Sequence, residues 1–127
     1  AYPSIDAAAA RLRAADPLLS DEHARFFAER GTVELPDGSR RFKHDPLHVT
    51  RGPYPFRIDV AETFWRAVTC PVLLVEGSES PFRVLENLER RVACFDGAER
   101  VVIEGASHMI QRHQPEALAG VLTRFLG

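Results

Sequence analysis

Two short stretches of the chain are apolar at every position instead of at alternate positions. They are residues 71–75 and 101–103, and each is followed two residues later by a glycine. A strand with this pattern is covered on both faces, as in a parallel sheet flanked by helices. We therefore predict two buried strands in the second half of the chain.

Helical periodicity surrounds these two strands. Apolar residues recur at helical spacing over 59–68, and prolines suited to a first helical position open segments 81–92 and 115–126. Asp59 and Glu62 form a capping-box-like start for the first of these helices. The order helix, strand, helix, strand, helix predicts an α/β fold with a parallel sheet.

The first half of the chain has a different pattern. Ser4 and Ser20 are placed to cap two short helices, the first stopped before Pro17 and the second at Gly31. The segments 32–35 and 40–43 then flank a Pro-Asp-Gly-Ser turn and predict a small hairpin or an extended turn. Residues 44–57 hold too many prolines for regular structure, and we expect a fixed loop there.

Two parallel strands do not make a complete sheet. Strands that are apolar on both faces leave unpaired edges and uncovered faces when only three helices accompany them, and an isolated two-stranded sheet is marginal. We therefore expect this chain to be the end of a sheet whose other strands lie elsewhere, which agrees with a sequence that begins at Ala1 without a methionine.

A histidine follows the second strand in an ordered pattern. Gly105-Ala106-Ser107-His108 comes directly after that strand, and Gln114-Pro115-Glu116 opens the last amphipathic helix. This pattern resembles the C-terminal signature of the α/β-hydrolase fold. The resemblance implies an α/β fold made of the C-terminal portion of an α/β-hydrolase parallel sheet, two strands with flanking helices, preceded by a mostly helical cap. We expect residues 1–57 to be the cap, or lid, and residues 58–127 to be the C-terminal part of the core.

The same resemblance implies a hydrolase with His108 as its catalytic base. The segments 41–48 and 53–57 also resemble the cap-to-core passage of serine-hydrolase-like members of the superfamily. The implied activity is hydrolysis of carboxylic esters through a Ser-His-acid mechanism that needs no cofactor. The nucleophile should lie in a Gly-x-Ser-x-Gly elbow, and no such motif occurs in the chain. We expect the nucleophile in a missing N-terminal half of the core, as serine or, as in haloalkane dehalogenases and epoxide hydrolases, as aspartate.

The sequence leaves more than one candidate for the acid that would orient the histidine. In the family it commonly stands three residues after the glycine that ends the penultimate strand, and that position, counted from Gly77, is Ser80. Serine supplies no negative charge, and Ser80 before a proline suits a helix N-cap. Glu79 is the first candidate and Glu76 the second. The remaining alternative is an acid outside the chain, or none.

A non-catalytic role is the rival hypothesis. A fragment with an exposed sheet edge could pair with the missing half or with a second copy of the chain. The net charge of -2 and the absence of a basic cluster interleaved with aromatic residues give no sign of nucleic-acid binding. The longest strongly apolar run, 71–75, is too short to span a bilayer, and we expect a cytoplasmic protein with a small-molecule substrate.

Several other side chains receive structural interpretations. We expect Cys70 and Cys94 to be buried free thiols, and His113 to lie on the surface. A metal site at His44 and His48 is disfavoured because Pro46 breaks the helix that would align them. Core packing is the favoured role for most of a set of aromatic residues, with a substrate pocket as the alternative: Phe26, Phe27, Tyr54, Phe56 and Trp65. A solvated surface is expected for the basic residues Arg40, Arg41, Lys43 and Arg51.

Overall fold

The chain folds into two compact units, Ala1–Gly52 and Pro53–Gly127. The computed structural model describes every residue except 50, 51 and 53. The predicted role of Arg51 and part of the predicted 44–57 loop therefore lie outside the described residues. Each unit is described by itself below.

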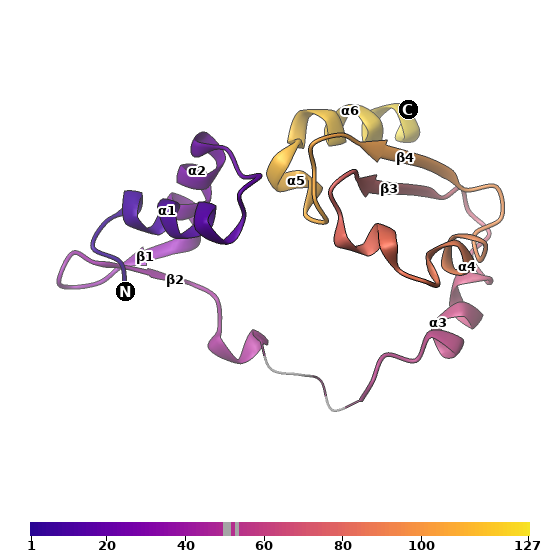
Figure 1. The fold of residues 1–127 in the computed structure, drawn as a ribbon, viewed down its shortest axis with the longest axis horizontal. Coiled ribbons are helices and arrows are strands. Elements are labelled where there is room, and N and C mark those ends of the chain that lie inside the picture. The colour runs from indigo at the N-terminus through magenta and orange to yellow at the C-terminus, as the bar shows by residue number, and fades with distance from the viewer. Residues whose placement is uncertain (50–51, 53) are drawn as a thin grey trace. The chain divides into compact units, whose positions relative to one another are not determined.

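The first unit begins with two helices, α1 (Ile5–Ala15) and α2 (Asp21–Gly31) (Figure 1). The hydroxyl of Ser4 accepts a hydrogen bond from the Ala7 amide at 3.1 Å, and that of Ser20 accepts one from the His23 amide at 3.1 Å. These bonds satisfy amide groups that a helix leaves unpaired at its start. Both predicted helices and both predicted caps are confirmed.

A small hairpin follows, formed by β1 (Thr32–Glu34) and β2 (Arg40–Phe42). The strands pair antiparallel, and Gly38 closes the turn with a φ of 79°. The prediction of a hairpin is therefore confirmed. A single 3-10 turn, η1 (Pro46–Val49), interrupts the segment for which no regular structure was expected.

Small side chains fill the interior of the first unit. Its buried apolar residues are Ala8, Leu19, Ala24 and Ala28. Alanines on the facing surfaces of α1 and α2 let the two helices approach closely. The basic surface is not uniformly solvated as predicted, because Arg40 is largely covered and pairs with Glu34 at 2.9 Å.

The second unit contains the two predicted strands, β3 (Leu73–Gly77) and β4 (Glu99–Ile103). They pair in parallel, with Leu73 opposite Glu99 and Gly77 opposite Ile103. In Figure 1 their arrowheads point the same way, toward the short helix α5 (Ile110–His113). The predicted parallel pair is confirmed, and its register brings both carboxyl ends to the same edge.

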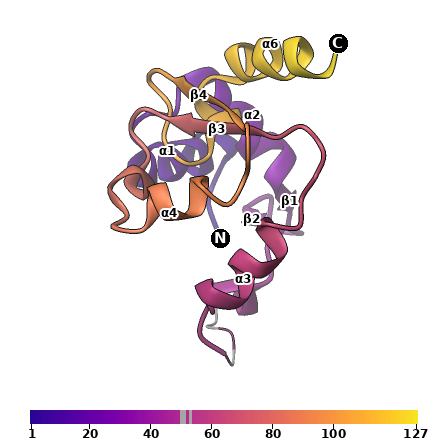
Figure 2. The same cartoon turned by 90° about the vertical axis from the view of Figure 1, so that its right-hand side faces the viewer.

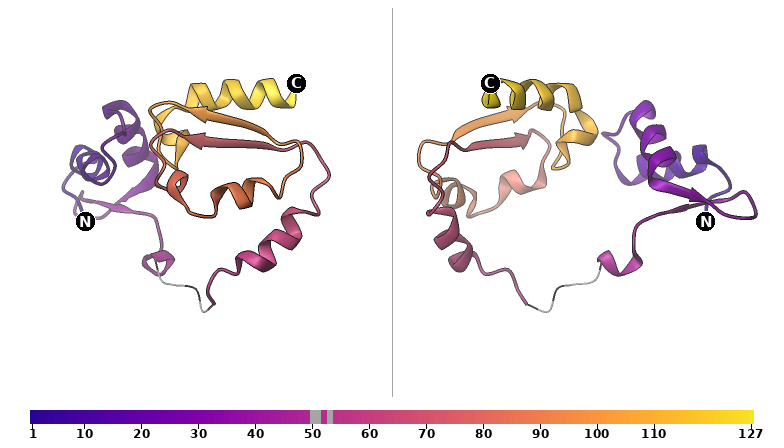
Figure 3. Two further views of the ribbon diagram at one scale, coloured as in Figure 1. Left: turned by 45° about the vertical axis from the view of Figure 1, so that its right-hand side comes forward. Right: turned by 180° about the vertical axis from the view of Figure 1, so that it is seen from behind.

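Three further helical segments accompany the strands: α3 (Ile58–Trp65), α4 (Leu88–Val92) and α6 (Pro115–Leu126). In Figures 2 and 3, α6 runs alongside β4, whereas α4 lies on the β3 side of the pair. The last helix begins at Pro115 as predicted. Within the part of the chain that the structure describes, no helix is long and apolar enough to cross a membrane.

The prediction of one continuous helix over 81–92 is wrong. A 3-10 turn, η2 (Pro81–Val84), is followed by Leu85 at φ -65° and ψ 125°, and α4 starts only at Leu88. The extended backbone at Leu85 interrupts the helical hydrogen bonds. Ser80 does cap η2, accepting a hydrogen bond from the Phe82 amide at 3.3 Å.

The predicted capping box at the start of α3 is also wrong. The N-cap position is Arg57, and Asp59 lies in the first turn, where it pairs with Arg57 at 2.5 Å. Glu62 is buried and accepts a hydrogen bond from Arg90 of α4 at 2.8 Å. A contact between two helices therefore holds the carboxylate that the sequence pattern assigned to a local cap.

The core of the second unit is small. Ile103, Ala106 and Ile110 form its buried centre, with further apolar residues packed against it: Val75, Val101, Leu118 and Val121. Several large apolar side chains remain exposed, namely Val60, Phe64, Val68, Val102, Leu122 and Leu126. β3 and β4 are consequently covered only in part, as expected for the end of a larger sheet.

Some predictions of burial are wrong. Phe26, Tyr54 and Phe56 are exposed, so core packing does not account for them. Trp65 is half-buried and contacts the ring of Phe95, with centroids 6.1 Å apart. Cys94 is a buried free thiol as predicted, but Cys70 precedes β3 and is exposed.

Candidate active site

Two loops meet at the carboxyl edge of the parallel pair. One follows β3 and runs over residues 78–80, and the other follows β4 and runs over residues 104–109. The Ser78 amide donates to the Ile103 carbonyl at 2.9 Å, and the Glu79 amide donates to the Ala106 carbonyl at 2.9 Å. Chemistry in open α/β sheets gathers at this edge because its loops face one crevice.

Gly77 allows the two loops to cross. A Cβ at this position would lie 2.2 Å from the Ala106 carbonyl oxygen and 2.3 Å from the Ser107 carbonyl oxygen. Both neighbours are backbone atoms, which cannot rotate away. The Ser78 hydroxyl adds a further tie, since it accepts a hydrogen bond from the Gly105 amide at 3.0 Å.

His108 lies in the second loop with its side chain exposed. Its ring meets the Phe82 ring edge to face, with centroids 4.4 Å apart and planes at 70°. A cavity of about 190 Å³ opens beside the two rings, and its other lining residues include Gly77, Ser80 and Ile110. The histidine is thus held against an aromatic wall with one side open to a small hollow.

His113 is buried, which contradicts the prediction that it lies on the surface. It sits on the same face of α5 as Ile110, and its Nδ1 accepts a hydrogen bond from the Ser107 amide at 3.1 Å. This bond fixes the backbone one residue before His108. A signal was present in the sequence, because Ile110 and His113 are spaced three apart, as on one face of a helix.

Neither acidic candidate, Glu79 or Glu76, forms a hydrogen bond or ion pair with His108 in the described part of the chain. Glu79 is exposed, and its carboxylate accepts a hydrogen bond from the Ser78 hydroxyl at 3.3 Å. Glu76 is largely covered and pairs with Arg100 at 2.5 Å and with Arg83 at 3.7 Å.

Charge at this edge is distributed unevenly. The carboxylates of Glu76 and Glu89 hold the pKa of Arg100 well above its ordinary value, with Glu76 the larger contributor. Glu76 is therefore committed to neutralising guanidinium groups. Glu79 has no cationic partner among the described residues and is the more available of the two carboxylates.

Metal chemistry finds no support at this edge. Over residues 1–49, 52 and 54–127, no group of three or more His, Cys, Asp or Glu side chains could hold a metal ion. The loops supply instead an exposed imidazole, a nearby carboxylate and a backbone crossing at a sheet edge. A base of this kind can accept a proton from a nucleophile and pass it to a leaving group.

The fold and this edge define a class. The chain has the fold of the C-terminal part of an α/β-hydrolase, with the two last strands of the sheet, their helices and a preceding helical segment. This confirms the α/β fold expected from the resemblance. No family model matches the sequence, and no curated protein matches it.

Several solved structures are similar to this chain. The chain is similar to a thioesterase domain from the curacin biosynthetic pathway, with 27% identity, a TM-score of 0.80 and coverage of 97% of this chain and 44% of that one. It is similar to a hypothetical protein from Pseudomonas aeruginosa PAO1, with 23% identity, a TM-score of 0.83 and coverage of 98% and 44%. An E-2-(acetamidomethylene)succinate hydrolase is similar at 24% identity and a TM-score of 0.76, with coverage of 98% and 46%. The chain thus spans less than half the length of these structures.

Proposed function

We propose that this chain is the histidine-bearing part of an α/β-fold hydrolase that acts on carboxylic esters. The observation that carries the proposal is the position of His108, exposed beside a hollow at the carboxyl edge of a parallel pair. The similarity to a thioesterase domain at 27% identity supports acyl transfer to water as the reaction. Residues 1–57 would form the cap above the substrate.

His108 acts as the general base in this proposal. A serine supplied by the preceding half of the core gives its proton to the imidazole while its oxygen attacks the ester carbonyl. The imidazolium then protonates the leaving alcohol, and an acyl-enzyme remains. Water hydrolyses the acyl-enzyme by the same route, with His108 again accepting and returning the proton.

Three groups of this chain prepare His108 for that role. The Phe82 ring limits its rotation, and His113 fixes the preceding backbone through Ser107. Glu79 is the carboxylate that would orient the imidazole. Its carboxylate is free for this role apart from the hydrogen bond that it accepts from the Ser78 hydroxyl.

The test uses the protein that contains this chain together with its preceding core half. We expect a fluorophosphonate probe to modify one serine, and we expect His108→Gln to slow both this reaction and ester hydrolysis by about 10³-fold. Glu79→Gln should slow them less, because it removes orientation and charge stabilisation but not the base. Intact mass and initial rates measure the two effects.

The matched control is Glu116→Gln, which removes an exposed carboxylate of α6 outside both loops. It should leave the rate and the probe reaction unchanged. An adduct that forms equally fast in the His108→Gln protein would contradict the role of His108 as base. Rapid hydrolysis of an epoxide or alkyl halide without a serine adduct would instead favour an aspartate nucleophile.

A second candidate function has one specific observation in its favour. Among the described residues β3 pairs only with β4, which leaves its other edge unpaired, and the same unit exposes apolar side chains such as Phe64 of α3. A chain of this kind can pair through that edge with a second copy and have no catalytic role. The rate of amide hydrogen exchange along β3 separates this candidate from the first.

A further inference from the structure

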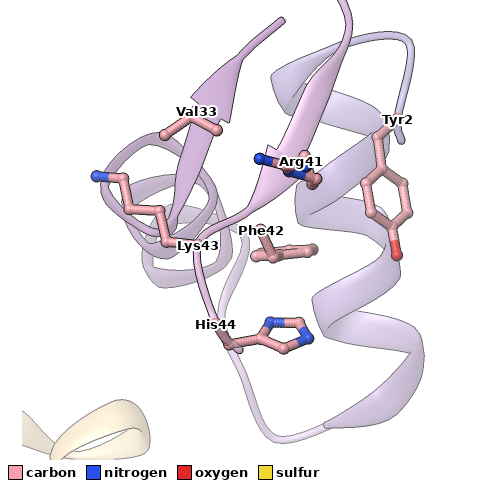
Figure 4. A pocket seen from close by; sticks show the side chains of 6 residues that line it. All are labelled: Tyr2, Val33, Arg41, Phe42, Lys43 and His44. Atoms are coloured by element: carbon pink, nitrogen blue, oxygen red, sulfur yellow. The ribbon is translucent and has the colours of Figure 1, made fainter. Parts of the chain in front are cut away.

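A hollow larger than the one beside His108 lies in the first unit. Its volume is about 500 Å³, and it is lined by Tyr2, Val33, Arg41, Phe42, Lys43 and His44 (Figure 4). A second hollow of about 220 Å³ shares three of these residues and adds Arg11, Leu12 and Ala15. Both hollows are therefore lined by one group of rings, those of Tyr2, Phe42 and His44.

The rings form an ordered wall. Tyr2 meets Phe42 edge to face, with centroids 5.4 Å apart and planes at 78°. His44 lies at 32° to Phe42 with centroids 6.1 Å apart. In Figure 4 the rings of Phe42 and His44 are neighbours, with Tyr2 to one side. This wall offers flat apolar surface to a ligand.

The charge on this wall is cationic and not neutralised. Neither hollow is lined by an acidic side chain. Arg41 has no ion-pair or hydrogen-bond partner in the part of the chain that the structure describes. Three other guanidinium groups of the unit are paired, namely Arg13 with Asp21, Arg25 with Asp6, and Arg40 with Glu34. Arg11, which lines the smaller hollow, forms no ion pair among the described residues and adds to its positive charge.

Lys43 contributes less than its charge suggests. Its ammonium donates to the Arg30 carbonyl at 2.8 Å, and in Figure 4 its side chain extends away from the rings. Arg41 lines the same hollow as the rings of Phe42 and His44. A free guanidinium is suited to two parallel hydrogen bonds with a carboxylate or phosphate.

We propose that the hollow beside Arg41 binds a small organic anion, with its carboxylate or phosphate group on Arg41 and an attached apolar ring against Phe42 and His44. Ligand sites of this type combine an apolar wall with a few polar groups that fix orientation. The proposal uses none of the residues to which the proposed hydrolysis assigns a chemical step, because every lining residue belongs to the first unit.

Titration of the ¹⁵N-labelled 127-residue chain with phenyl phosphate tests the site. We expect saturable shifts at the amides of Tyr2 and of residues 41–44. Inorganic phosphate and benzyl alcohol each offer one half of the ligand, so each should bind about tenfold more weakly or less. A parallel titration with benzoate shows whether a carboxylate binds the site as tightly as a phosphate does.

Two variants make the test specific. Arg41→Gln should weaken phenyl phosphate binding by about tenfold or more, because a charge-assisted pair is lost. Arg13→Gln makes the same change of charge in the same unit, away from both hollows, and should leave the affinity unchanged. Equal weakening by both variants, equal binding of inorganic phosphate, or no saturable shift at these amides would each overturn the proposal.

Discussion

At Gly77 the absence of a side chain determines whether the candidate site can form. The loops after β3 and β4 cross there, and two backbone carbonyl oxygens occupy the space of a Cβ. The crossing brings Glu79 and His108 to one edge of the sheet. A packing requirement at one residue thus underlies the chemistry proposed for its neighbours.

Gly77→Ala should therefore destabilise the second unit. We expect a fall of about 2–4 kcal/mol in the free energy of unfolding, since the backbone must move to relieve two close contacts. Urea unfolding followed by the fluorescence of Trp65, the one tryptophan of the chain, measures it.

The control for this prediction is Gly120→Ala. Gly120 lies inside α6 with open space at its Cβ position, so alanine should stabilise the unit by about 0.5–1 kcal/mol. A Gly77→Ala protein as stable as the original would mean that the two loops do not cross as described.

At the scale of elements, charged pairs fix where the helices of the second unit begin and what they contact. Arg57 precedes α3 and pairs with Asp59 in its first turn, and Glu62 one turn later pairs with Arg90 of α4. The pKa of Asp59 is lowered, chiefly by the hydrogen bond from Arg57. The pKa of Arg90 is raised, chiefly by its hydrogen bond with Glu62.

Arg57→Gln should raise the pKa of Asp59 toward its ordinary value of 3.8. A carboxyl whose pKa is lowered by folding adds stability above its unfolded pKa, and that contribution disappears as the pH falls through the folded value. The variant should therefore lose less stability on acidification. NMR titration of the Asp59 carboxyl resonance measures the shift directly.

Asp37 serves as the internal reference in the same titration. Its pKa is lowered by the hydroxyl and amide of Ser39 in the hairpin turn, and the hydroxyl is the larger cause. Arg57→Gln should leave it unchanged, whereas Ser39→Ala should raise it and leave Asp59 as it was. If either variant shifted the pKa of both Asp37 and Asp59, the cause would be a general effect of charge and not the two local hydrogen bonds.

On the scale of the whole molecule, the parallel sheet has two strands among the described residues, β3 and β4. The Glu99 amide donates to the Val72 carbonyl and the Ser78 amide donates to the Ile103 carbonyl, each at 2.9 Å. Along a strand of a parallel pair, backbone amides point alternately toward the partner strand and away from it. The amides of Leu74 and Glu76 therefore face β4. Those of Leu73 and Val75 face the free edge.

Hydrogen exchange should report this alternation. In the dilute 127-residue chain, we expect the amides of Leu73 and Val75 to exchange about tenfold faster or more than those of Leu74 and Glu76. If the proposed preceding half of the core pairs with β3, its presence should protect Val75. Protection of Val75 that grows with the concentration of this chain alone would instead support pairing of two copies, and equal protection at all dilutions would contradict a free edge.

Local sequence patterns determined the order of the elements. Capping serines at positions 4 and 20, fully apolar runs before Gly77 and Gly105, and Pro115 at a helix start each act within a few residues, so their structures followed from the chain alone. The resemblance placed His108 at a sheet edge by the same local logic.

Tertiary structure decided the contacts between segments far apart in the chain. Glu76 forms an ion pair with Arg100. Glu62 does not form the predicted capping box and instead pairs with Arg90, 28 residues away. His113 is buried because α5 packs against the loop before His108. No local pattern encodes such pairings, since each depends on which surfaces the fold brings together and how much water it excludes between them.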